Sequence, residues 1–196
     1  MNFLAHFYLS DHHDQLLAGN FVADFVRGKK YRLYPETIGQ GIIMHRKIDT
    51  FTDSHPLTRQ SISRVRPRFG KLAGVVVDMF YDYLLASDWQ NYHRQPLQQF
   101  ADNTCQRLQQ QARHFPEQAV YVLGHMQRYN WLANYARIEG IRASLNGIGH
   151  RFLARTGANI ELGSATDLLV AEEQAFRQEF SLFFEQIRAA APSFTS

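Results

Sequence analysis

The chain has 196 residues, of which 45% are hydrophobic and 13% aromatic, so it is long and apolar enough to bury a sizeable core. A charged fraction of 20% and an ordinary content of glycine and proline exclude a disordered, low-complexity or collagen-like chain. Lysine and arginine number 21 against 18 aspartate and glutamate residues, and the resulting formal net charge of +3 does not by itself indicate a nucleic-acid-binding protein.

Apolar residues recur at intervals of three and four along most of the chain, which is the period of an α-helix. Leu17, Phe21 and Phe25 show this spacing, and Val76 and Phe80 repeat it later. The pattern predicts helices over residues 2–9, 14–26, 35–52, 57–65, 70–86, 96–115, 117–136, 138–152 and 166–190. Because no linker divides these helices, we expect an all-α bundle in which residues 1–196 form a single domain.

Local signals set several helix boundaries. Pro67 predicts a turn after the helix over 57–65, and a run containing three glycine or asparagine residues predicts a loop over 155–164. Asp14 is expected to cap the helix that follows it. The adjacent His13 and Asp14 are therefore interpreted as a helix start rather than as a metal-binding motif.

The cysteine content and the apolar runs indicate the compartment. Cys105 is the only cysteine, which excludes an internal disulfide and a cysteine-based zinc site and favours the reducing cytoplasm. The first residues carry no basic leader, and the apolar run over 72–85 is interrupted by Asp78 and Asp82. We therefore expect neither a signal peptide nor a membrane span.

Histidine and aspartate are concentrated within the apolar helices of the first 85 residues. His45 and Asp49 are four residues apart, as are Asp78 and Asp82, so each pair shares one face of its helix. An apolar helix does not bury two carboxylates unless a cation, hydrogen bonds or basic partners compensate for their charge. A bound metal ion would provide that compensation.

Imidazole and carboxylate ligands without cysteine suit Mn²⁺, Fe²⁺, Zn²⁺ or Mg²⁺, which activate water for hydrolysis. Arg27 and Arg46 lie close in sequence to the candidate ligands, where a guanidinium can hold phosphate oxygens. Taken singly, His6, Asp24 or Asp49 is equally typical of a capping or hydrogen-bonded residue. In combination they favour a metal site for phosphoester hydrolysis.

Four segments carry a resemblance to a known family: NFLAH at 2–6, GNFVADFVRG at 19–28, GIIMHRKIDTFTD at 41–53 and DMFYDYLL at 78–85. In sequence and order they resemble the acyl carrier protein phosphodiesterase family, and SLNGIGHR at 144–151 resembles its C-terminal part. The resemblance implies a helical fold related to the HD-domain metal phosphohydrolases. It also implies an enzyme that hydrolyses 4'-phosphopantetheine from holo acyl carrier protein to give the apo protein, with Mn²⁺ as cofactor and Mg²⁺ or Fe²⁺ as alternatives.

The resemblance also implies roles for individual residues. Asp24 or Asp82 would accept a proton from a metal-activated water that attacks the phosphorus, and Arg27 and Arg46 would contact the phosphate. One departure from the HD pattern is that no adjacent His-Asp pair occurs in the segment GIIMHRKID. The metal ligands that the resemblance implies are His6, Asp24, His45, Asp49, Asp78 and Asp82.

The expected partner is holo acyl carrier protein as substrate, with no nucleic acid, no membrane and no particular oligomeric state favoured. Because these carriers are acidic, the stretch over 59–71, which has no acidic residue and includes Arg64 and Arg68, is a candidate docking surface that salt would screen. Two alternatives stay open. One is a metal-dependent phosphohydrolase of nucleotides or another small phosphoester, and the other is a non-catalytic helical binding module.

Overall fold

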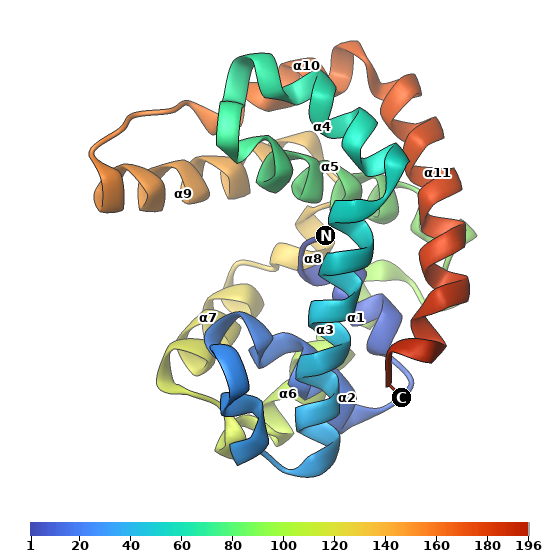
Figure 1. The fold of residues 1–196 in the computed structure, drawn as a ribbon, viewed down its shortest axis with the longest axis vertical. Coiled ribbons are helices and arrows are strands. Elements are labelled where there is room, and N and C mark those ends of the chain that lie inside the picture. Colours follow the sequence, from blue (N-terminus) through green and yellow to red (C-terminus); the bar gives the residue numbers. More distant parts are fainter. Residues whose placement is uncertain (196) are drawn as a thin grey trace.

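A computed structural model describes residues 1–195, which form helices joined by short loops (Figure 1). This part of the chain contains no β-strand, so the predicted all-α class is confirmed, and none of its helices is long and apolar enough to cross a membrane. The α-helices are α1 (Phe3–Ser10), α2 (Asp14–Val22), α3 (Glu36–Ser54), α4 (Pro56–Phe69), α5 (Ala73–Ser87), α6 (Leu97–Gln110), α7 (Glu117–Arg128), α8 (Trp131–Asn134), α9 (Ile138–Thr156), α10 (Ala165–Ala171) and α11 (Glu173–Ala190). The 3-10 turns are η1 (Ala23–Phe25), η2 (Gly28–Leu33), η3 (Gly70–Leu72), η4 (Trp89–Asn91), η5 (Ala112–His114), η6 (Leu162–Ser164) and η7 (Ala191–Thr195).

Helix boundaries differ from the prediction at several places, and three of the differences have a local origin. The helix predicted over 117–136 is interrupted at Asn130, whose left-handed φ of 48° separates α7 from α8. The predicted turn at Pro67 is wrong: α4 continues through this proline to Phe69, and Gly70, with a φ of 52°, ends it. The helix predicted over 166–190 is divided into α10 and α11, which a single residue, Glu172, separates.

Two other helix ends depend on single side chains. The side chain of His13, rather than that of Asp14, accepts the backbone N–H that caps α2, so the predicted Asp14 cap is wrong. The Asp14 carboxylate instead accepts a hydrogen bond from Arg107 at 2.6 Å. The loop predicted before the last helices is present, and it begins where Gly157, with a φ of 73°, ends α9.

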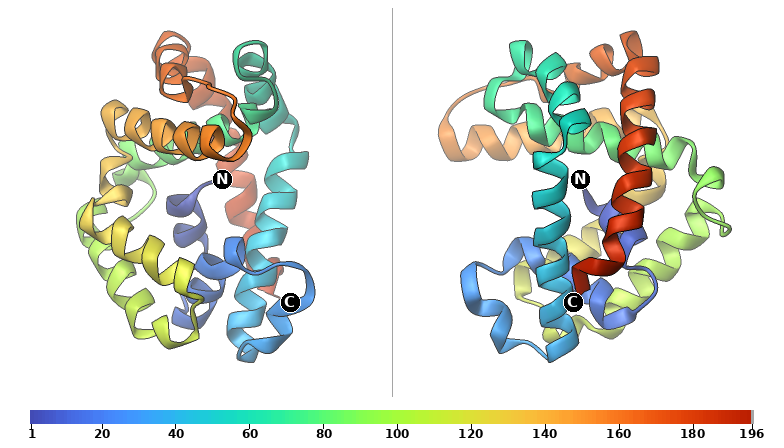
Figure 2. Two further views of the ribbon diagram at one scale, coloured as in Figure 1. Left: turned by 90° about the vertical axis from the view of Figure 1, so that its left-hand side faces the viewer. Right: turned by 45° about the vertical axis from the view of Figure 1, so that its right-hand side comes forward.

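The helices form two groups, and α3 rises from the lower group to the base of α4 in the upper group, beside α11 (Figures 1 and 2). In Figure 1, α4, α5, α9 and α10 lie at the top and α2, α6 and α7 lie at the bottom, with α1 between the two groups. The amino group of Met1 is buried in the interior, 3.0 Å from Asp78 of α5. The start of α1 therefore lies where both groups meet.

The apolar face of α11 covers one side of α1 and α5. The ring centroid of Phe180 in α11 lies 5.2 Å from that of Tyr81. The ring centroid of Phe184 lies 5.4 Å from that of Tyr8. Such aromatic pairs stabilise the core beyond the area they bury. The buried face follows the helical period with Phe176, Phe180, Phe183, Phe184 and Ile187.

The closest helix contact, between α2 and α3, depends on two glycines. A Cβ atom at Gly19 would lie 2.0 Å from the carbonyl oxygen of Ile38, and one at Gly41 would lie 2.3 Å from that of Leu16. Only glycine permits this approach of two backbones. Asn20 follows Gly19 directly, and His45 lies one helical turn beyond Gly41, so the contact brings both residues to one place.

Arg64 joins α4 to α11 and is therefore engaged within the fold rather than offered to an acidic partner. Its Nε and Nη2 atoms donate to Oε1 of Glu179 at 3.1 and 2.9 Å, and its Nη1 donates to Glu172 at 2.9 Å. The Glu179 side chain is only 6% exposed and also accepts a hydrogen bond from Ser61. The Arg64 cation thus compensates for the charge of the Glu179 carboxylate, which is buried at the contact between α4 and α11.

We expect the Arg64→Ala substitution to lower the free energy of unfolding by about 2–3 kcal/mol, because it leaves the buried Glu179 carboxylate without its cation. Chemical denaturation followed by circular dichroism measures this change. The exposed neighbour Arg68, substituted in the same way, is the control and should stay within about 0.5 kcal/mol of the wild type. Equal stability of Arg64→Ala and wild type would contradict the structural role.

Candidate metal centre

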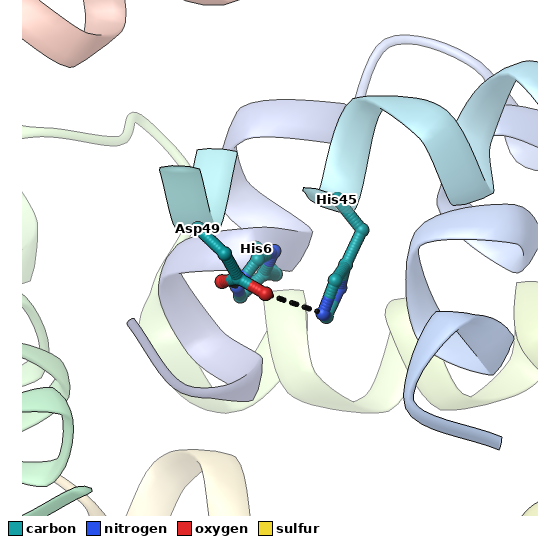
Figure 3. Close-up of side chains that lie close together, drawn as sticks. All are labelled: His6, His45 and Asp49. Carbon is teal, nitrogen blue, oxygen red and sulfur yellow. Dashed lines mark hydrogen bonds and ion pairs between the residues drawn. The ribbon is translucent and has the colours of Figure 1, made fainter. Parts of the chain in front are cut away.

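Three side chains from two helices converge beside the start of α1 (Figure 3). His6 comes from α1, and His45 and Asp49 come from α3; their ligand atoms all lie within 4.8 Å of one another. The Nε2 atoms of His6 and His45 each lie 3.1 Å from a different oxygen of Asp49. The imidazole rings stack with centroids 4.0 Å apart. We call these three residues the His–Asp cluster.

Asn20 of α2 orients both imidazoles. Its Oδ1 atom lies 2.9 Å from Nδ1 of His6 and 3.0 Å from Nδ1 of His45. Its Nδ2 atom donates to the backbone carbonyl of His6 at 3.1 Å, which fixes the orientation of the carboxamide. Because a carboxamide oxygen only accepts hydrogen bonds, both Nδ1 atoms carry hydrogen and both Nε2 atoms face Asp49.

Burial and neighbouring charges separate the protonation of the two histidines. Burial, together with the charge of the adjacent His45, lowers the pKa of His6 to about 4. Burial also opposes the charging of His45, but hydrogen bonds to Asp24 and Asp49 outweigh it and raise its pKa to about 9. The same imidazoles hold the pKa of Asp49 far below its ordinary value despite burial. At neutral pH, His45 is therefore charged and His6 is neutral.

The donor set of the His–Asp cluster fits a divalent cation. The neutral His6 ring carries one N–H, yet its two nitrogens face two acceptor oxygens, those of Asn20 and Asp49. With the hydrogen on Nδ1, a lone pair of Nε2 points at a carboxylate lone pair. A cation between them removes this conflict, and two imidazoles with a carboxylate are ligands that Mn²⁺, Fe²⁺ and Zn²⁺ accept.

The cluster opens into a cavity of about 290 Å³, which we call the His–Asp cavity. Four carboxylates line it, from Asp24, Asp49, Asp53 and Asp78, and none of its lining residues within the described chain is lysine or arginine. Such a concentration of negative charge attracts cations. The other lining residues are Met1, Asn2, Phe3, His6, Asn20, His45, Val75 and Ile148.

The remaining aspartates predicted as ligands lie in three different settings. Asp24 of η1 is adjacent to the cluster, with its Oδ1 atom 3.3 Å from Nε2 of His45. Asp78 lines the same cavity but pairs with the amino group of Met1. Asp82 is fully buried one turn along α5, where its two oxygens accept the backbone N–H groups of Leu4 and Ala5 at 2.9 and 3.2 Å.

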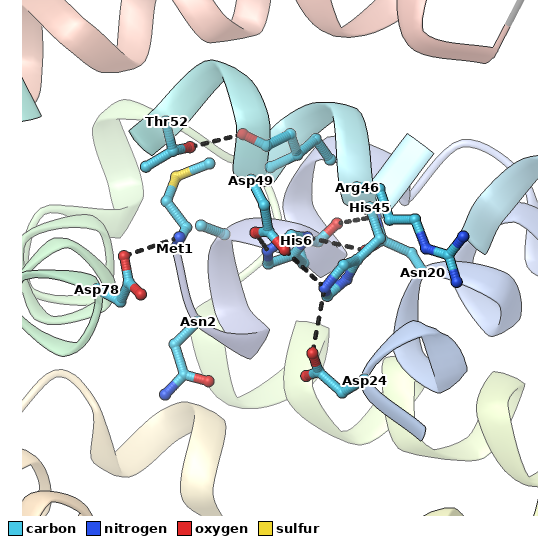
Figure 4. A network of polar contacts seen from close by, with 12 residues as sticks. Met1, Asn2, His6, Asn20, Asp24, His45, Arg46, Asp49, Thr52 and Asp78 are labelled. Atoms are coloured by element: carbon cyan, nitrogen blue, oxygen red, sulfur yellow. Dashed lines mark hydrogen bonds and ion pairs between the residues drawn. The ribbon is translucent and has the colours of Figure 1, made fainter. Parts of the chain in front are cut away.

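The two arginines predicted to contact phosphate lie outside the cavity lining. Arg46 donates from both terminal nitrogens to backbone carbonyls, of Gly28 at 2.8 Å and of Val26 at 2.7 Å, and its side chain points away from the His–Asp cluster (Figure 4). Arg27 is exposed at the start of η2. In this structure Arg46 therefore holds the turn that follows Asp24, a contact that positions the neighbouring backbone.

Sequence reasoning missed two residues of the site. Asn20 lies four residues before Asp24, and this spacing places both residues on one side of the chain as it leaves α2. A single neutral asparagine, however, does not indicate a metal site in a sequence. Asp53 lies four residues after Asp49 and was not among the candidate ligands, but it lines the His–Asp cavity. The helical period through His45, Asp49 and Asp53 was the available clue.

We expect the Asn20→Ala substitution to weaken Mn²⁺ affinity by about 10–100-fold, because both imidazoles lose the acceptor that sets their orientation. Isothermal titration of the purified protein with Mn²⁺ measures the change. Asn159, which is exposed in the loop after α9, provides a matched alanine control that should bind as the wild type does. Unchanged affinity in Asn20→Ala would show that Asn20 does not orient metal ligands.

Comparison with known proteins assigns a family. The family described as acyl carrier protein phosphodiesterase matches residues 1–187. Curated proteins with this name from Enterobacter sp. (strain 638) and Salmonella agona (strain SL483) are 33% identical, and one from Salmonella paratyphi A is 34% identical, each over 77% of this chain and 79% of the relative. No solved structure matches the chain. The resemblance seen in the sequence is thus confirmed, and the chain belongs to the acyl carrier protein phosphodiesterase family.

Proposed function

We propose that this protein hydrolyses the phosphodiester that joins 4'-phosphopantetheine to holo acyl carrier protein. The observation that carries the proposal is the His–Asp cluster, which opens into a carboxylate-lined cavity in a chain of this family. The reaction adds the elements of water across the bond between phosphorus and the serine oxygen of the carrier. Apo protein with a free serine hydroxyl and 4'-phosphopantetheine are the products.

We assign Mn²⁺ to the His–Asp cluster, with Mg²⁺ or Fe²⁺ as alternatives. His6, His45 and Asp49 would hold it, and Asp24, which contacts His45, is a further candidate ligand. A divalent cation in this position supplies Lewis-acid activation of water and stabilises negative charge on the phosphoryl oxygens. The charge of the cavity supports this assignment, because its four carboxylates outnumber its two positive groups, the Met1 amino group and His45, and the excess negative charge repels a phosphodiester unless a cation is bound.

The protein side chains orient the reactants and move the proton. Asn20 accepts from Nδ1 of both imidazoles, so that both Nε2 atoms face the cavity, and His45 would lose its Nε2 proton when a cation binds. Asp24, whose side chain is 57% exposed and which lines the cavity, accepts the proton of the attacking water. Asp82 is the less suitable acceptor, since both of its oxygens already bind backbone N–H groups.

The test of the proposed function is the intact mass of holo acyl carrier protein after incubation with the purified protein and Mn²⁺. A loss of the phosphopantetheine mass that a chelator prevents is the expected result. Free nucleotides incubated in parallel test the alternative of a nucleotide phosphohydrolase. An unchanged carrier together with hydrolysed nucleotides would overturn the proposal in favour of that alternative.

The surface of α4 beside the cavity is the docking surface that we propose for the acidic carrier. Arg59 and Arg66 line a surface depression together with Asp53, which also lines the His–Asp cavity. These cations are exposed, unlike Arg64, which is engaged with α11. A carrier that docks on them lies next to the candidate metal centre, and its approach benefits from electrostatic steering.

We expect the double substitution Arg59→Glu and Arg66→Glu to raise KM for the carrier by about 10-fold at low salt, because it reverses charge at the docking surface. The difference from the wild type should shrink at about 0.5 M salt, where exposed charges are screened. Steady-state kinetics at two salt concentrations measure both effects. Arg113→Glu, on exposed η5, is the charge-matched control, and an equal rise in KM there would refute a local docking surface.

We further propose that the fold is distantly related to the HD-domain phosphohydrolases. The helical architecture with imidazole and carboxylate ligands on α1 and α3 supports this relation. The departure noted in the sequence persists in space, because His45 and Asp49 act from consecutive turns of one helix. A crystal structure with bound Mn²⁺, superposed on HD-domain enzymes, tests the relation.

Cytoplasmic location is part of the same proposal. Cys105 is a free, buried thiol, and burial raises its pKa to about 11, so it is neither paired nor reactive. A chain whose single thiol stays reduced is typical of a reducing compartment. Fractionation of cells that express the protein, followed by immunoblotting, is the test, and a periplasmic signal would contradict it.

A further inference from the structure

A second cavity of about 490 Å³ lies beside the His–Asp cavity, against α9. Its volume is in the range of roughly 300–1,000 Å³ that is usual for small-molecule sites. The face of α9 that lines it carries Ser144, Gly147, Ile148 and Arg151, which follow the helical period. The opposite wall comes from α5 and from the segment around α8. We call this space the α9 cavity.

The two cavities are contiguous. Asn2, Phe3, Asp24 and Ile148 line both of them. Asn2 lies between Asp78 and Asp24, at the edge of the His–Asp cavity (Figure 4). A ligand with its phosphate at the His–Asp cluster therefore extends past these shared residues into the α9 cavity.

The lining of the α9 cavity differs from that of the His–Asp cavity. Met79, Trp131 and Tyr135 provide apolar and aromatic walls, and Tyr135 is only 2% exposed, so it lies deep in the fold. Asn134 and Ser144 add a carboxamide and a hydroxyl. Across both cavities of the described chain, Arg151 is the only lysine or arginine that lines the wall.

We propose that the α9 cavity binds the pantetheine arm of the substrate, an inference that rests on the proposed function. The arm begins at the phosphate, carries a dimethyl-substituted carbon and a hydroxyl, and continues through two amides to a thiol. Aromatic walls suit its aliphatic carbons, and the donors of Arg151, Asn134 and Ser144 suit its amide carbonyls. The thiol end lies toward Trp131 and Tyr129, which line only the α9 cavity.

This assignment gives a function to the SLNGIGHR segment at 144–151, which supplies no candidate metal ligand. It also explains recognition of an uncharged arm by a site whose other half is strongly acidic. Binding energy from a part of the substrate remote from the phosphorus is available to orient the reacting bond. The cavity thereby selects pantetheine esters over simple phosphodiesters.

The first test fills the cavity. A Cβ atom at Gly147 would lie 3.6 Å from Nη1 of Arg151 and clash with no backbone, so the Gly147→Leu side chain fits α9 while it occupies the α9 cavity. Gly124, in exposed α7 with nothing within 4 Å of a Cβ, provides the matched Gly124→Leu control. Both substitutions replace a helical glycine by a better helix former, so neither is expected to prevent folding.

We expect Gly147→Leu to reduce the ratio of kcat/KM for holo carrier to kcat/KM for bis(p-nitrophenyl) phosphate by about 100-fold, because only the holo carrier carries the arm. Gly124→Leu should retain the wild-type ratio. A wild-type ratio in Gly147→Leu would overturn the assignment of the α9 cavity.

The second test measures binding without catalysis. The chain has two tryptophans, of which Trp131 lines the α9 cavity and Trp89 packs against Phe100 elsewhere. In a Trp89→Phe background, free pantetheine should change the fluorescence of Trp131 in a saturable manner, and Gly147→Leu should abolish the change. Saturable binding without cleavage of holo carrier would leave the cavity assignment standing and reject the proposed function. Cleavage of holo carrier without any pantetheine-dependent change would reject the cavity assignment alone.

Discussion

Replacing Asp49 with alanine should reduce Mn²⁺-dependent cleavage of holo carrier by at least about 1,000-fold, well beyond the 10–100-fold typical of residues behind the metal ligands. Asp49 contacts the Nε2 atoms of both imidazoles of the His–Asp cluster, through a different oxygen to each. Its loss removes a ligand and also the anion that keeps the two rings facing the same point. Mass analysis of the carrier and titration with Mn²⁺ measure activity and metal binding on the same preparation.

Two controls separate this effect from general damage. Asp49→Asn keeps the size of the side chain but removes its charge, and we expect a loss close to that of the alanine variant. Asp102→Ala, on the exposed side of α6, removes a carboxylate that lies outside the site and should leave activity and metal binding unchanged. Turnover by Asp49→Ala within 10-fold of the wild type would exclude the His–Asp cluster as the metal centre.

The sequence was informative about the site wherever two ligands share one helix. The spacing of His45 and Asp49 predicts that both lie on one face, and they meet at 3.1 Å. The contribution of His6 follows from tertiary packing, because α1 crosses α3 at this point. The orienting role of Asn20 depends on the close contact of Gly19 with α3, which no periodicity reveals.

The pair Asp78 and Asp82 shows the limit of the same argument. Both lie on one face of α5, as predicted. Successive turns of that face, however, contact different parts of the fold. Asp78 reaches the His–Asp cavity, whereas Asp82 reaches the first turn of α1. The sequence predicts which face carries a carboxylate, and the packing of a helix 78 residues away in the chain decides what it contacts.

Helix positions were predictable for a similar reason. The apolar period is a property of each segment alone, so the existence of most helices follows from it. Their interruptions depend on single residues with unusual backbone conformations, such as Asn130, or on contacts made elsewhere, such as those of Glu172, which lies between α10 and α11 and pairs with Arg64. These features leave no periodic trace in the sequence.

Replacing Asp82 should change stability far more than metal binding. In the wild type, its oxygens accept the N–H groups of Leu4 and Ala5, which have no acceptor within the first turn of α1. We expect Asp82→Ala to lower the free energy of unfolding by about 3 kcal/mol, because both buried N–H groups lose their acceptor. Mn²⁺ affinity should stay within about 3-fold of the wild type, since Asp82 does not line the His–Asp cavity.

The pH dependence provides an independent check on Asp82. Burial raises its pKa to about 7 from an ordinary value of 3.8, although the N–H groups of Leu4 and Ala5 oppose this shift. Between these two pH values the folded state therefore binds more protons than the unfolded state. This proton uptake stabilises the fold at low pH, and the stabilisation is lost as the pH rises through 7. In Asp82→Asn the position is neutral at every pH, and its carboxamide accepts only one of the two bonds.

The stability advantage of the wild type over Asp82→Asn should thus be larger at pH 5 than at pH 8, by on the order of 2–3 kcal/mol. Urea denaturation of both proteins at the two pH values measures this difference, and titrations common to both proteins cancel. If the advantage were constant with pH and Asp82→Ala lost Mn²⁺ binding, Asp82 would have to be a metal ligand that moves into the cavity when the ion binds. A pH-dependent advantage with intact Mn²⁺ binding instead establishes Asp82 as the residue that anchors α1, and with it His6, beneath the His–Asp cluster.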